Sequence, residues 1–441
     1  MSGITGIIRD LNINPALYET FIHFFHASSW NHKTICIKWM KVVFGSGHIY
    51  KINNRAILLG DGVQQHKEGK KTPGVKKLRQ ESGDSSKGGY IFGHFYGVLG
   101  VLAGTSKKIF CIPLTAAIHN GVDVIRKWAD EKHEAVSHVV QMAKDACEAA
   151  SVFGESLLLL DRYYLSVPLL GELNKHNEKP GANKIFLVAR AKKNLTAYTR
   201  PEEPGKRGPG APRKKGMEVK LIDIFTHVAN FASATVIWRG EEVPIKYTHV
   251  DLLWGKKLYQ ELRFVLVYAE GVKSILVSTD LTYTPEMIIS LYGYRFKIEV
   301  TFKAIKQSIG AFFSHFWCKS MPKLNRYAKK DSPDPLESVI DKDDQNNIVR
   351  SLKAIEGHTL FGCIAIGLLQ LLSLEFSHAI APENFRWLRT KSNAIPSEAT
   401  FIDFLRKSFY WMFANNRLSS ILRFISLRQS QCFESPDDLA G

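Results

Sequence analysis

The sequence has few cysteines, and none of them are paired. Six occur in 441 residues, and they stand far apart: Cys36, Cys111, Cys147, Cys318, Cys363 and Cys432. There is no C-x-x-C pair and no zinc-type spacing, which excludes a zinc-binding module and a disulfide framework. We therefore expect reduced thiols in a cytosolic protein.

The sequence also lacks the hydrophobic runs that secreted and membrane proteins carry. The N-terminal stretch MSGITGIIRDLNINP has no basic region followed by an apolar core, so we do not expect secretion. The most apolar run, from Thr359 to Leu374, is shorter than a membrane span, and Gln370 and Ser373 interrupt it. It predicts a buried helix and no membrane partner.

Acidic residues are in short supply relative to basic ones. Lysine and arginine total 59 against 42 aspartates and glutamates, which gives a net charge of +17 and a pI near 9.4. This excess favours a polyanionic partner, nucleic acid first and an anionic membrane surface second. With 45% hydrophobic residues, the chain is long enough to bury a large core in two or three lobes.

The most informative stretch is LYGYRFKIEVTFKAIKQ, from Leu291 to Gln307. Thr284 and Pro285 provide a helix-start signal upstream, and the pattern predicts one helix. On that helix four residues fall on one narrow stripe, because about 100° separates successive residues. They are Tyr292, Arg295, Glu299 and Lys306. A surface helix with Arg-Glu ion pairs is the simpler explanation of such a stripe.

The spacing Tyr-x2-Arg-x3-Glu-x6-Lys resembles the signature of bacterial insertion-sequence transposases of the DDE class. One departure is Phe296, which stands where a Trp commonly follows the Arg. The resemblance implies that Glu299 is the last of three metal-binding carboxylates. It also implies two further carboxylates upstream, each at the end of a buried strand.

Two aspartates occupy such positions. Asp61 ends the apolar run RAILLGD, and Asp161 ends LLLLD. The elements around them are expected in the order three strands, helix, strand, helix, strand: 55–61, 89–103, 108–117, 121–151, 156–160, 167–173 and 184–191. This order is that of a ribonuclease-H-like core, an α/β fold with a mixed sheet and flanking helices, in which the first and fourth strands each end in a carboxylate.

Asp280 is a rival for the second metal position. It ends another apolar run, ILVSTD, only 19 residues before Glu299. Asp161 is favoured because RYYLS follows it, as the resemblance leads us to expect. Asp280 is expected to form the turn before the helix.

The sequence divides into five expected regions. Residues 1–50 are an N-terminal helical region, for which DNA-end binding and simple packing are equally suited. Residues 51–194 form the first part of the catalytic core, and 195–277 form a β-rich insertion that begins with a Gly/Pro/basic stretch. Residues 278–318 carry the core helix with the Tyr-Arg-Glu-Lys stripe. Residues 319–441 are a connector and a C-terminal helical region.

Carboxylates from three separate elements suit phosphodiester cleavage with two Mg²⁺ ions, which Mn²⁺ can replace. The expected catalytic and metal-binding set is Asp61, Asp161 and Glu299. Arginine, lysine and tyrosine side chains suit phosphate and base contacts. The expected DNA-binding set is Tyr292, Arg295, Lys306, Lys70, Lys71, Arg213, Lys214 and Lys215. For the basic residues outside the helix, a solvated loop is the alternative.

The resemblance therefore implies a DNA transposase that cleaves strands at transposon ends and transfers them into target DNA. Its partners would be double-stranded DNA, both terminal inverted repeats and target, and a second copy of the chain in a synaptic complex. We expect it in the bacterial cytoplasm with the nucleoid. Two alternatives stay open: a catalytically silent, transposase-derived DNA-binding protein, and a ribonuclease-H-like nuclease that cuts without joining.

Overall fold

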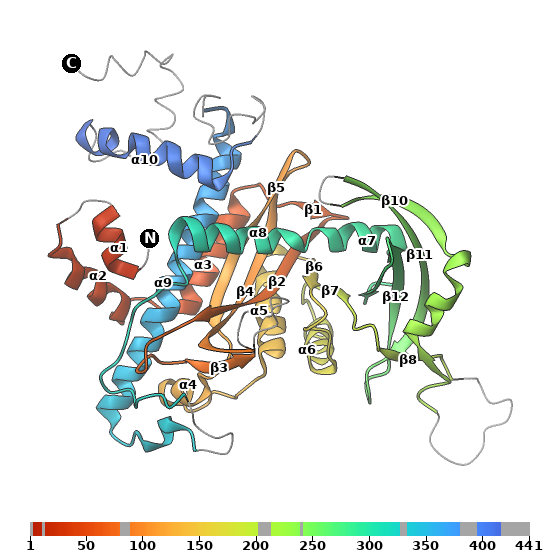
Figure 1. Ribbon diagram of the computed structural model, residues 1–441, viewed down its shortest axis with the longest axis horizontal. Helices are drawn as coiled ribbons and strands as arrows, with labels where there is room; N and C mark the ends of the chain where they lie inside the picture. Colours follow the sequence, from red (N-terminus) through yellow and green to blue (C-terminus); the bar gives the residue numbers. More distant parts are fainter. Residues whose placement is uncertain are drawn as a thin grey trace.

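A computed structural model describes residues 3–10, 14–79, 89–201, 213–238, 241–326, 333–379 and 395–415. The described chain is built on one large mixed sheet with helices on both faces (Figure 1). The expected α/β class with a mixed sheet is thus confirmed.

Five strands form the part of the sheet in which the sequence predicts the site. In sheet order they are β5 (Lys108–Ile118), β4 (Tyr90–Thr105), β2 (Arg55–His66), β6 (Ser156–Leu160) and β7 (Ile185–Arg190). Neighbours among the first three are antiparallel, whereas β2, β6 and β7 run parallel. All five residues of β6, SLLLL, are buried, as is usual for a parallel strand covered on both faces.

Side chains alternate between two cores, one on each face of this sheet. Ile57, Leu59 and Leu157 face one core together with Ile298 of the helix region that carries Glu299. Even-numbered neighbours such as Leu58 and Leu158 face the other core, with Met142 of α5. Because strand side chains alternate with a period of two, the odd positions of β2 and β6 point toward the Glu299 helix.

The single helix expected over 121–151 is wrong. The structure has α4 (Asp123–Ala129) and α5 (His138–Phe153), separated by the polar run that begins DEKHE. Asp130 ends α4 in an extended conformation, and its side chain accepts a hydrogen bond from the Lys132 N–H, which offers the backbone an alternative to the helix. Helix α6 (Val167–Asn177) follows β6 and is capped by Ser166.

The β-rich region extends the same sheet beyond β7. Strand β13 (Val272–Ser278) pairs with β7, and the sheet continues through β12 (Gln260–Ala269) and β11 (Glu241–Trp254). The remaining elements here are β8 (Thr196–Tyr198), β9 (Glu218–Lys220), the 3-10 helix η1 (Leu221–Asn230) and β10 (Ala232–Trp238). Figure 1 shows β10, β11 and β12 curving away from the central strands.

Helices from both ends of the chain flank the central strands. The N-terminal region has α1 (Gly3–Asp10), α2 (Leu17–His26) and α3 (His32–Gly45), in line with the helical region expected over residues 1–50. The short strands β1 (Lys51–Ile52) and β3 (Lys76–Arg79) lie at the edges of β2 and β4. The later part contains η3 (Pro335–Ser338), α9 (Lys342–Glu375), η4 (Ser377–Ala379) and α10 (Glu398–Asn415).

Helix α9 contains the predicted buried helix, which is confirmed. By length and composition α9 is able to cross a membrane, but 61% of its most apolar window is buried, as in a core helix of a soluble protein. The two polar residues that interrupt the run have partners: Gln370 donates to Glu398 over 2.8 Å, and Ser373 donates to the Pro396 carbonyl. The Gln370 amide nitrogen and the Ser373 hydroxyl thus find partners inside the fold, whereas the buried Gln370 Oε1 has none among the described residues.

The helix predicted from Leu291 to Gln307 is broken rather than continuous. Helix α7 (Pro285–Gly293) begins at the expected cap, where Thr284 accepts a hydrogen bond from the Met287 N–H. Helix α8 (Phe296–Ala304) follows after a tight turn at Tyr294 and Arg295, and a π-helical turn, η2 (Ile305–Ile309), ends it. Around the break the backbone bonds join residues three apart, such as Arg295 N–H to the Tyr292 carbonyl.

Candidate active site on the face of the sheet

Asp61 and Asp161 stand at matching positions on neighbouring parallel strands. The last registered pair of β2 and β6 is Gly60 opposite Leu160, so each aspartate is the next residue along its strand. Both have odd numbers and so follow the side chains that face α8.

Asp61 does not end its strand, which corrects the sequence-based expectation. Strand β2 continues to His66 because β4 pairs with it throughout, from Leu58 opposite Val101 to His66 opposite Gly93. The parallel ladder with β6 nevertheless stops just before Asp61. The aspartate is thus held on a rigid strand and still lies beside the end of β6.

Arg295 and Tyr292 connect the two aspartates to the helix region. Arg295 Nη1 donates to Asp61 Oδ2 over 3.1 Å, and Nη2 of the same guanidinium donates to Glu299 Oε1. The Tyr292 hydroxyl donates to Asp161 Oδ1 over 3.2 Å. All three predicted carboxylates therefore meet side chains of one short stretch, even though they come from three elements far apart in the sequence.

The electrostatics of the site follow from partial burial. The Asp61 side chain is 21% exposed, Arg295 15% and Glu299 41%. Burial raises the pKa of Asp61, the guanidinium of Arg295 opposes that change, and the nearby Asp161 adds to it. Burial also raises the pKa of the Tyr292 phenol, with Asp161 as the next cause, so this hydroxyl stays protonated and able to donate.

The donor set of the site suits a hard divalent cation. Three carboxylates supply oxygen ligands of the kind that Mg²⁺ prefers. Among the residues that the structure describes, however, no three His, Cys, Asp or Glu side chains are grouped closely enough to hold a metal ion. The Arg295 guanidinium binds Asp61 and Glu299 at the same time, so one positive charge is shared between these two carboxylates.

Gly62 allows close packing beside Asp61. A Cβ atom at this position would lie 2.4 Å from the Phe95 ring and 3.2 Å from the Tyr164 hydroxyl oxygen. A larger residue would have to displace these rings, and with them the strand that carries Asp61.

Asp280 lies at the opposite end of β2 from Asp61. It binds Arg55, the first residue of β2, and Arg55 also contacts Tyr283 over 2.8 Å and Glu155 over 3.3 Å. Strands β2 and β6 both begin here, whereas Asp61 is six residues further along. Asp280 is therefore a partner of Arg55, and the structure does not bring it to the other carboxylates.

Lys306 lies in the π-helical turn η2, and the other predicted basic residues are dispersed. Lys306 is half-buried, makes no hydrogen bond or ion pair with any described residue, and has its pKa lowered by burial. Lys71 donates to the Lys319 carbonyl over 2.9 Å, and the Lys215 ammonium lies 3.8 Å from the centre of the Tyr198 ring. Lys70, Arg213 and Lys214 are exposed. Residues 202–212, the start of the Gly/Pro/basic stretch, lie outside the described chain.

The sequence did not point to a polar cluster behind the aspartates. His119 is fully buried with Nε2 3.5 Å from Asp145 Oδ2, and His138 stacks on the Tyr163 ring with centroids 5.0 Å apart. Burial raises the pKa of the Tyr164 phenol, and Asp61 is the next cause. The only sequence signal was the tyrosine pair Tyr163-Tyr164, two residues past Asp161; nothing in the local sequence marked the histidines.

These features were compared with known proteins. No protein-family model, curated protein or solved structure matches this chain.

Proposed function

We propose that this chain is a DNA transposase that cleaves phosphodiester bonds at transposon ends and joins the freed strand to target DNA in a metal-dependent reaction. The observation that carries the proposal is the meeting of Asp61, Asp161 and Glu299 at the contacts of Arg295 and Tyr292. A tyrosine, an arginine and a glutamate at this spacing were expected, from the resemblance, to meet two strand-borne aspartates.

The topology of the central strands gives separate support. The order β5-β4-β2-β6-β7, antiparallel in its first part and parallel in its second, is the order expected for a ribonuclease-H-like core. In such a core the first and fourth strands carry the aspartates, which here are β2 and β6. The connection between them contains α5, as a parallel crossover requires.

In this proposal Asp61, Asp161 and Glu299 hold the Mg²⁺ ions. Bound Mg²⁺ would activate the attacking water or 3′ hydroxyl and neutralise charge on the leaving oxygen. The chain's own residues position the DNA: Arg295 offers a planar fork to a phosphate, and Tyr292 offers a hydroxyl and a ring. Arg295 is then shared between the carboxylates and the DNA, so metal and phosphate binding are coupled through it.

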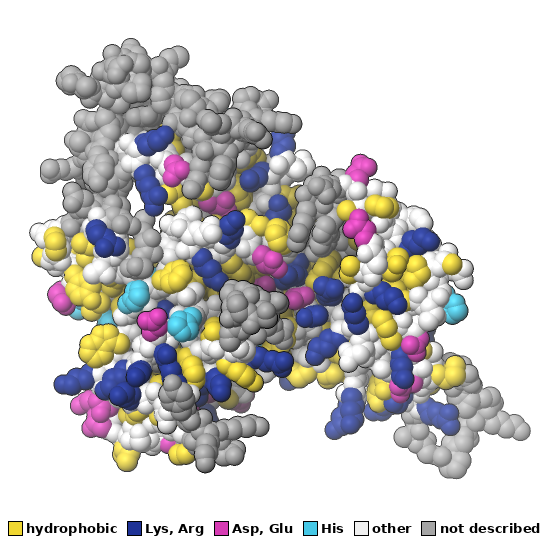
Figure 2. Space-filling view, viewed as in Figure 1, with side chains coloured by type: hydrophobic (Ala, Val, Ile, Leu, Met, Phe, Trp, Pro, Cys, Tyr) yellow, Lys and Arg dark blue, Asp and Glu magenta, His cyan; other side chains and the backbone are white. Residues whose placement is uncertain are grey.

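The charge distribution fits a polyanionic substrate. Figure 2 shows acidic side chains near the middle of the face where α7 and α8 meet, with Lys and Arg side chains on both sides. A net charge of +17 would attract DNA to the chain, and the small acidic centre would attract the metal. Recognition of terminal inverted repeats, pairing of two copies on DNA and a location with the nucleoid follow from the proposal.

The test is strand cleavage of labelled duplexes that carry the element's own ends, in Mg²⁺ or Mn²⁺. Wild type is compared with Glu299→Gln, and with Glu134→Gln as a matched control at an exposed position away from the site. The proposal requires cleavage and strand joining by wild type and by the control, and loss of both in Glu299→Gln with DNA binding retained. Hydrolysis without any joined product would favour a simple nuclease.

One observation favours a second candidate, a catalytically silent DNA-binding protein. The ion pairs of Arg295 occupy two of the three carboxylates, Asp61 and Glu299, with a cation of the chain itself. A protein of this kind would bind the same duplexes with unchanged affinity in Glu299→Gln and would cleave none of them in either metal.

A further inference from the structure

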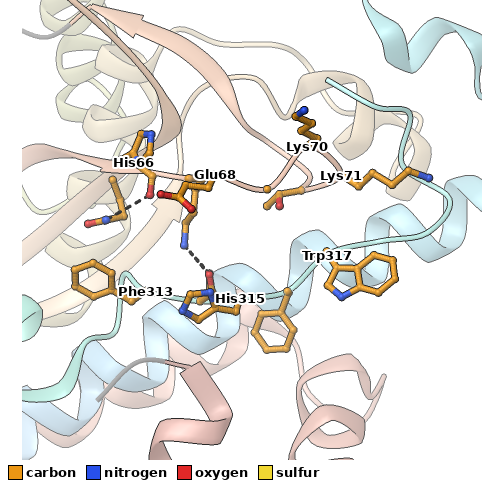
Figure 3. A pocket seen from close by; sticks show the side chains of 13 residues that line it. His66, Glu68, Lys70, Lys71, Phe313, His315 and Trp317 are labelled. Atoms are coloured by element: carbon orange, nitrogen blue, oxygen red, sulfur yellow. Dashed lines mark hydrogen bonds between the residues drawn. The ribbon is translucent and has the colours of Figure 1, made fainter. Parts of the chain in front are cut away.

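A cavity of about 680 Å³ lies beyond the end of β2, apart from the carboxylates. Two segments line it, residues 65–72 and residues 313–317. Figure 3 shows His66, Glu68, Lys70 and Lys71 along one side and Phe313, His315 and Trp317 along the other. Trp317 and Lys71 lie toward one end of the cavity, and Phe313 lies toward the other.

The segment 313–317 presents three rings in a regular row. Phe313, His315 and Trp317 are exposed, whereas the residues between them, Ser314 and Phe316, are buried. This alternation is typical of an extended segment with one solvent-exposed face and one buried face. The Trp317 side chain is 66% exposed, which is unusual for so large an apolar group and marks a binding surface better than a packing role.

A buried lysine fixes this row in place. Lys67 Nζ donates to the Phe312 carbonyl over 3.0 Å and to the Ser314 carbonyl over 2.7 Å. At the other end, the Cys318 N–H donates to the Lys71 carbonyl over 3.0 Å. The rings are therefore carried by a backbone tied to the opposite wall at both ends, so little ordering remains to be done when a ligand binds.

The spacing of the rings selects the ligand. Rings two residues apart on an extended segment are separated by about 6.8 Å along the chain. Stacked bases in a duplex repeat about every 3.4 Å on each strand, so the rings match every second base level. A base enters between two rings only when its strand is unpaired and unstacked, which is how aromatic platforms bind single strands.

Cations lie toward the Trp317 end of the cavity, as a phosphate backbone needs. Lys70 and Lys71 line the cavity, and Glu68 is the one carboxylate among the described residues that line it. A second hollow of about 360 Å³ shares Lys70 and adds Lys323 and Arg326. Lys70 lies between the two hollows, and its carbonyl accepts a hydrogen bond from the Leu324 N–H over 2.8 Å, so the segments that line them are in contact. Together they form a basic groove with an aromatic floor.

The groove lies beyond the end of the strand that carries Asp61. Lys67 follows Asp61 by six residues on and just past β2, which is a distance of about 20 Å along an extended strand. A DNA strand leaving the carboxylates along β2 would therefore reach the rings after several nucleotides.

We propose that the groove formed by 65–72, 313–317 and 323–326 binds a short unpaired segment of a DNA strand, with a base stacked on Trp317 and phosphates on Lys70 and Lys323. This inference rests on the proposed function only in taking DNA as the partner. The groove lies apart from the metal ligands, so binding there needs no metal and no cleavage.

The test is fluorescence-anisotropy binding of a labelled thymidine oligonucleotide of about eight nucleotides, in EDTA. The variants are Trp317→Ala, Trp317→Phe and a matched control, Phe44→Ala, whose ring is 46% exposed on α3. We expect Trp317→Ala to weaken binding about five-fold to one-hundred-fold, the loss of one base–aromatic stack, and Trp317→Phe to keep most of the affinity. Phe44→Ala should bind as wild type does.

Three arms decide between stacking and charge. A blunt duplex and heparin offer phosphate or sulfate without free bases. The affinity of Trp317→Ala for either ligand should therefore fall less than two-fold. The double variant Lys70→Gln, Lys323→Gln should bind all three ligands more weakly. The salt dependence of its affinity should correspond to about two fewer counterions released on binding. The proposal is overturned if Trp317→Ala binds the oligonucleotide as wild type does. It is also overturned if the variant loses as much affinity for heparin and the duplex as for the oligonucleotide.

Cleavage by the same variants separates this proposal from the proposed function. If the oligonucleotide binds through Trp317 while no metal-dependent cleavage occurs, the groove stands and the transposase proposal falls. If cleavage depends on Glu299 while Trp317→Ala binds the oligonucleotide normally, the transposase proposal stands and the groove falls.

Discussion

Arg295 donates to Asp61 across 3.1 Å while its other terminal nitrogen holds Glu299, so one guanidinium joins two carboxylates of the proposed metal site. The same cation is proposed to bind a DNA phosphate. It serves both purposes only by exchanging its carboxylate partners for phosphate when metal enters. Arg295 is therefore expected to couple the two ligands.

Removal of Arg295 should strengthen metal binding in the absence of DNA. We expect Arg295→Gln to raise the affinity for Mn²⁺ about ten-fold, because a competing charge beside Asp61 and Glu299 is lost. The same variant should bind DNA ends more weakly. Isothermal titration of Mn²⁺ measures the first effect, with Arg200→Gln, an exposed arginine paired with Glu261, as control. Weaker Mn²⁺ binding in Arg295→Gln would contradict the coupling.

Asp280→Asn should lower stability and leave the metal site intact. Burial raises the pKa of Asp280, but hydrogen bonds from Thr282 and the charge of Arg55 outweigh it, so the pKa lies below 3.8. The stabilisation is thus present above that pH and is lost as the pH falls through the folded-state pKa. We expect the variant to lose about 3 kcal/mol at pH 7, the cost of leaving a buried partner unpaired. Urea unfolding measures this loss, and unchanged Mn²⁺ affinity separates Asp280 from Asp161.

Lys306→Gln should weaken DNA binding and leave metal binding unchanged. Lys306 is half-buried, its pKa is lowered by that burial, and no described residue compensates its charge. A phosphate would supply that compensation. We expect a several-fold loss of affinity and a salt dependence reduced by about one ion. The exposed Lys303 provides the control variant Lys303→Gln, and equal losses in both variants would show that only net charge matters.

The sequence predicted the elements that depend on local chemistry. Helix α7 starts at Thr284-Pro285 and the run SLLLL forms the buried strand β6, as expected. A helix cap and a strand that is buried on both faces can each be recognised from a few consecutive residues. It did not predict that β2 continues past Asp61, because that continuation depends on pairing with β4, which is distant in sequence. The break at Arg295 is likewise a tertiary effect.

The candidate site divides in the same way. The spacing of Tyr292, Arg295 and Glu299 was visible in the sequence. The hydrogen bond from Tyr292 to Asp161, 131 positions away, and the ion pair of Arg295 with Asp61, 234 positions away, were not. His119 and His138 gave no signal, since their surroundings come from β5, α5 and the turn after β6. The sequence FSHFW, residues 313–317, contains the ring residues. Only the hydrogen bonds of Lys67 to this segment distinguish it from an ordinary loop.

Lys67 should make stability depend on pH. Burial lowers its pKa from 10.5 to about 8. Between these values the unfolded chain holds a proton that the folded chain does not, so the free energy of unfolding rises with pH. Relative to Lys67→Met, we expect wild type to gain up to about 3 kcal/mol between roughly pH 7.5 and pH 10.5. Parallel pH profiles from urea unfolding would contradict this role.

The most direct test of the account is Mn²⁺ binding measured by electron paramagnetic resonance with the DNA duplex bound. Wild type is compared with Asp61→Asn, Asp161→Asn and Glu299→Gln. If the three carboxylates form the metal site, wild type binds about two ions, and each variant loses at least one of them while the duplex stays bound. If all three variants bind Mn²⁺ as wild type does, these residues are not the metal ligands and the account is wrong.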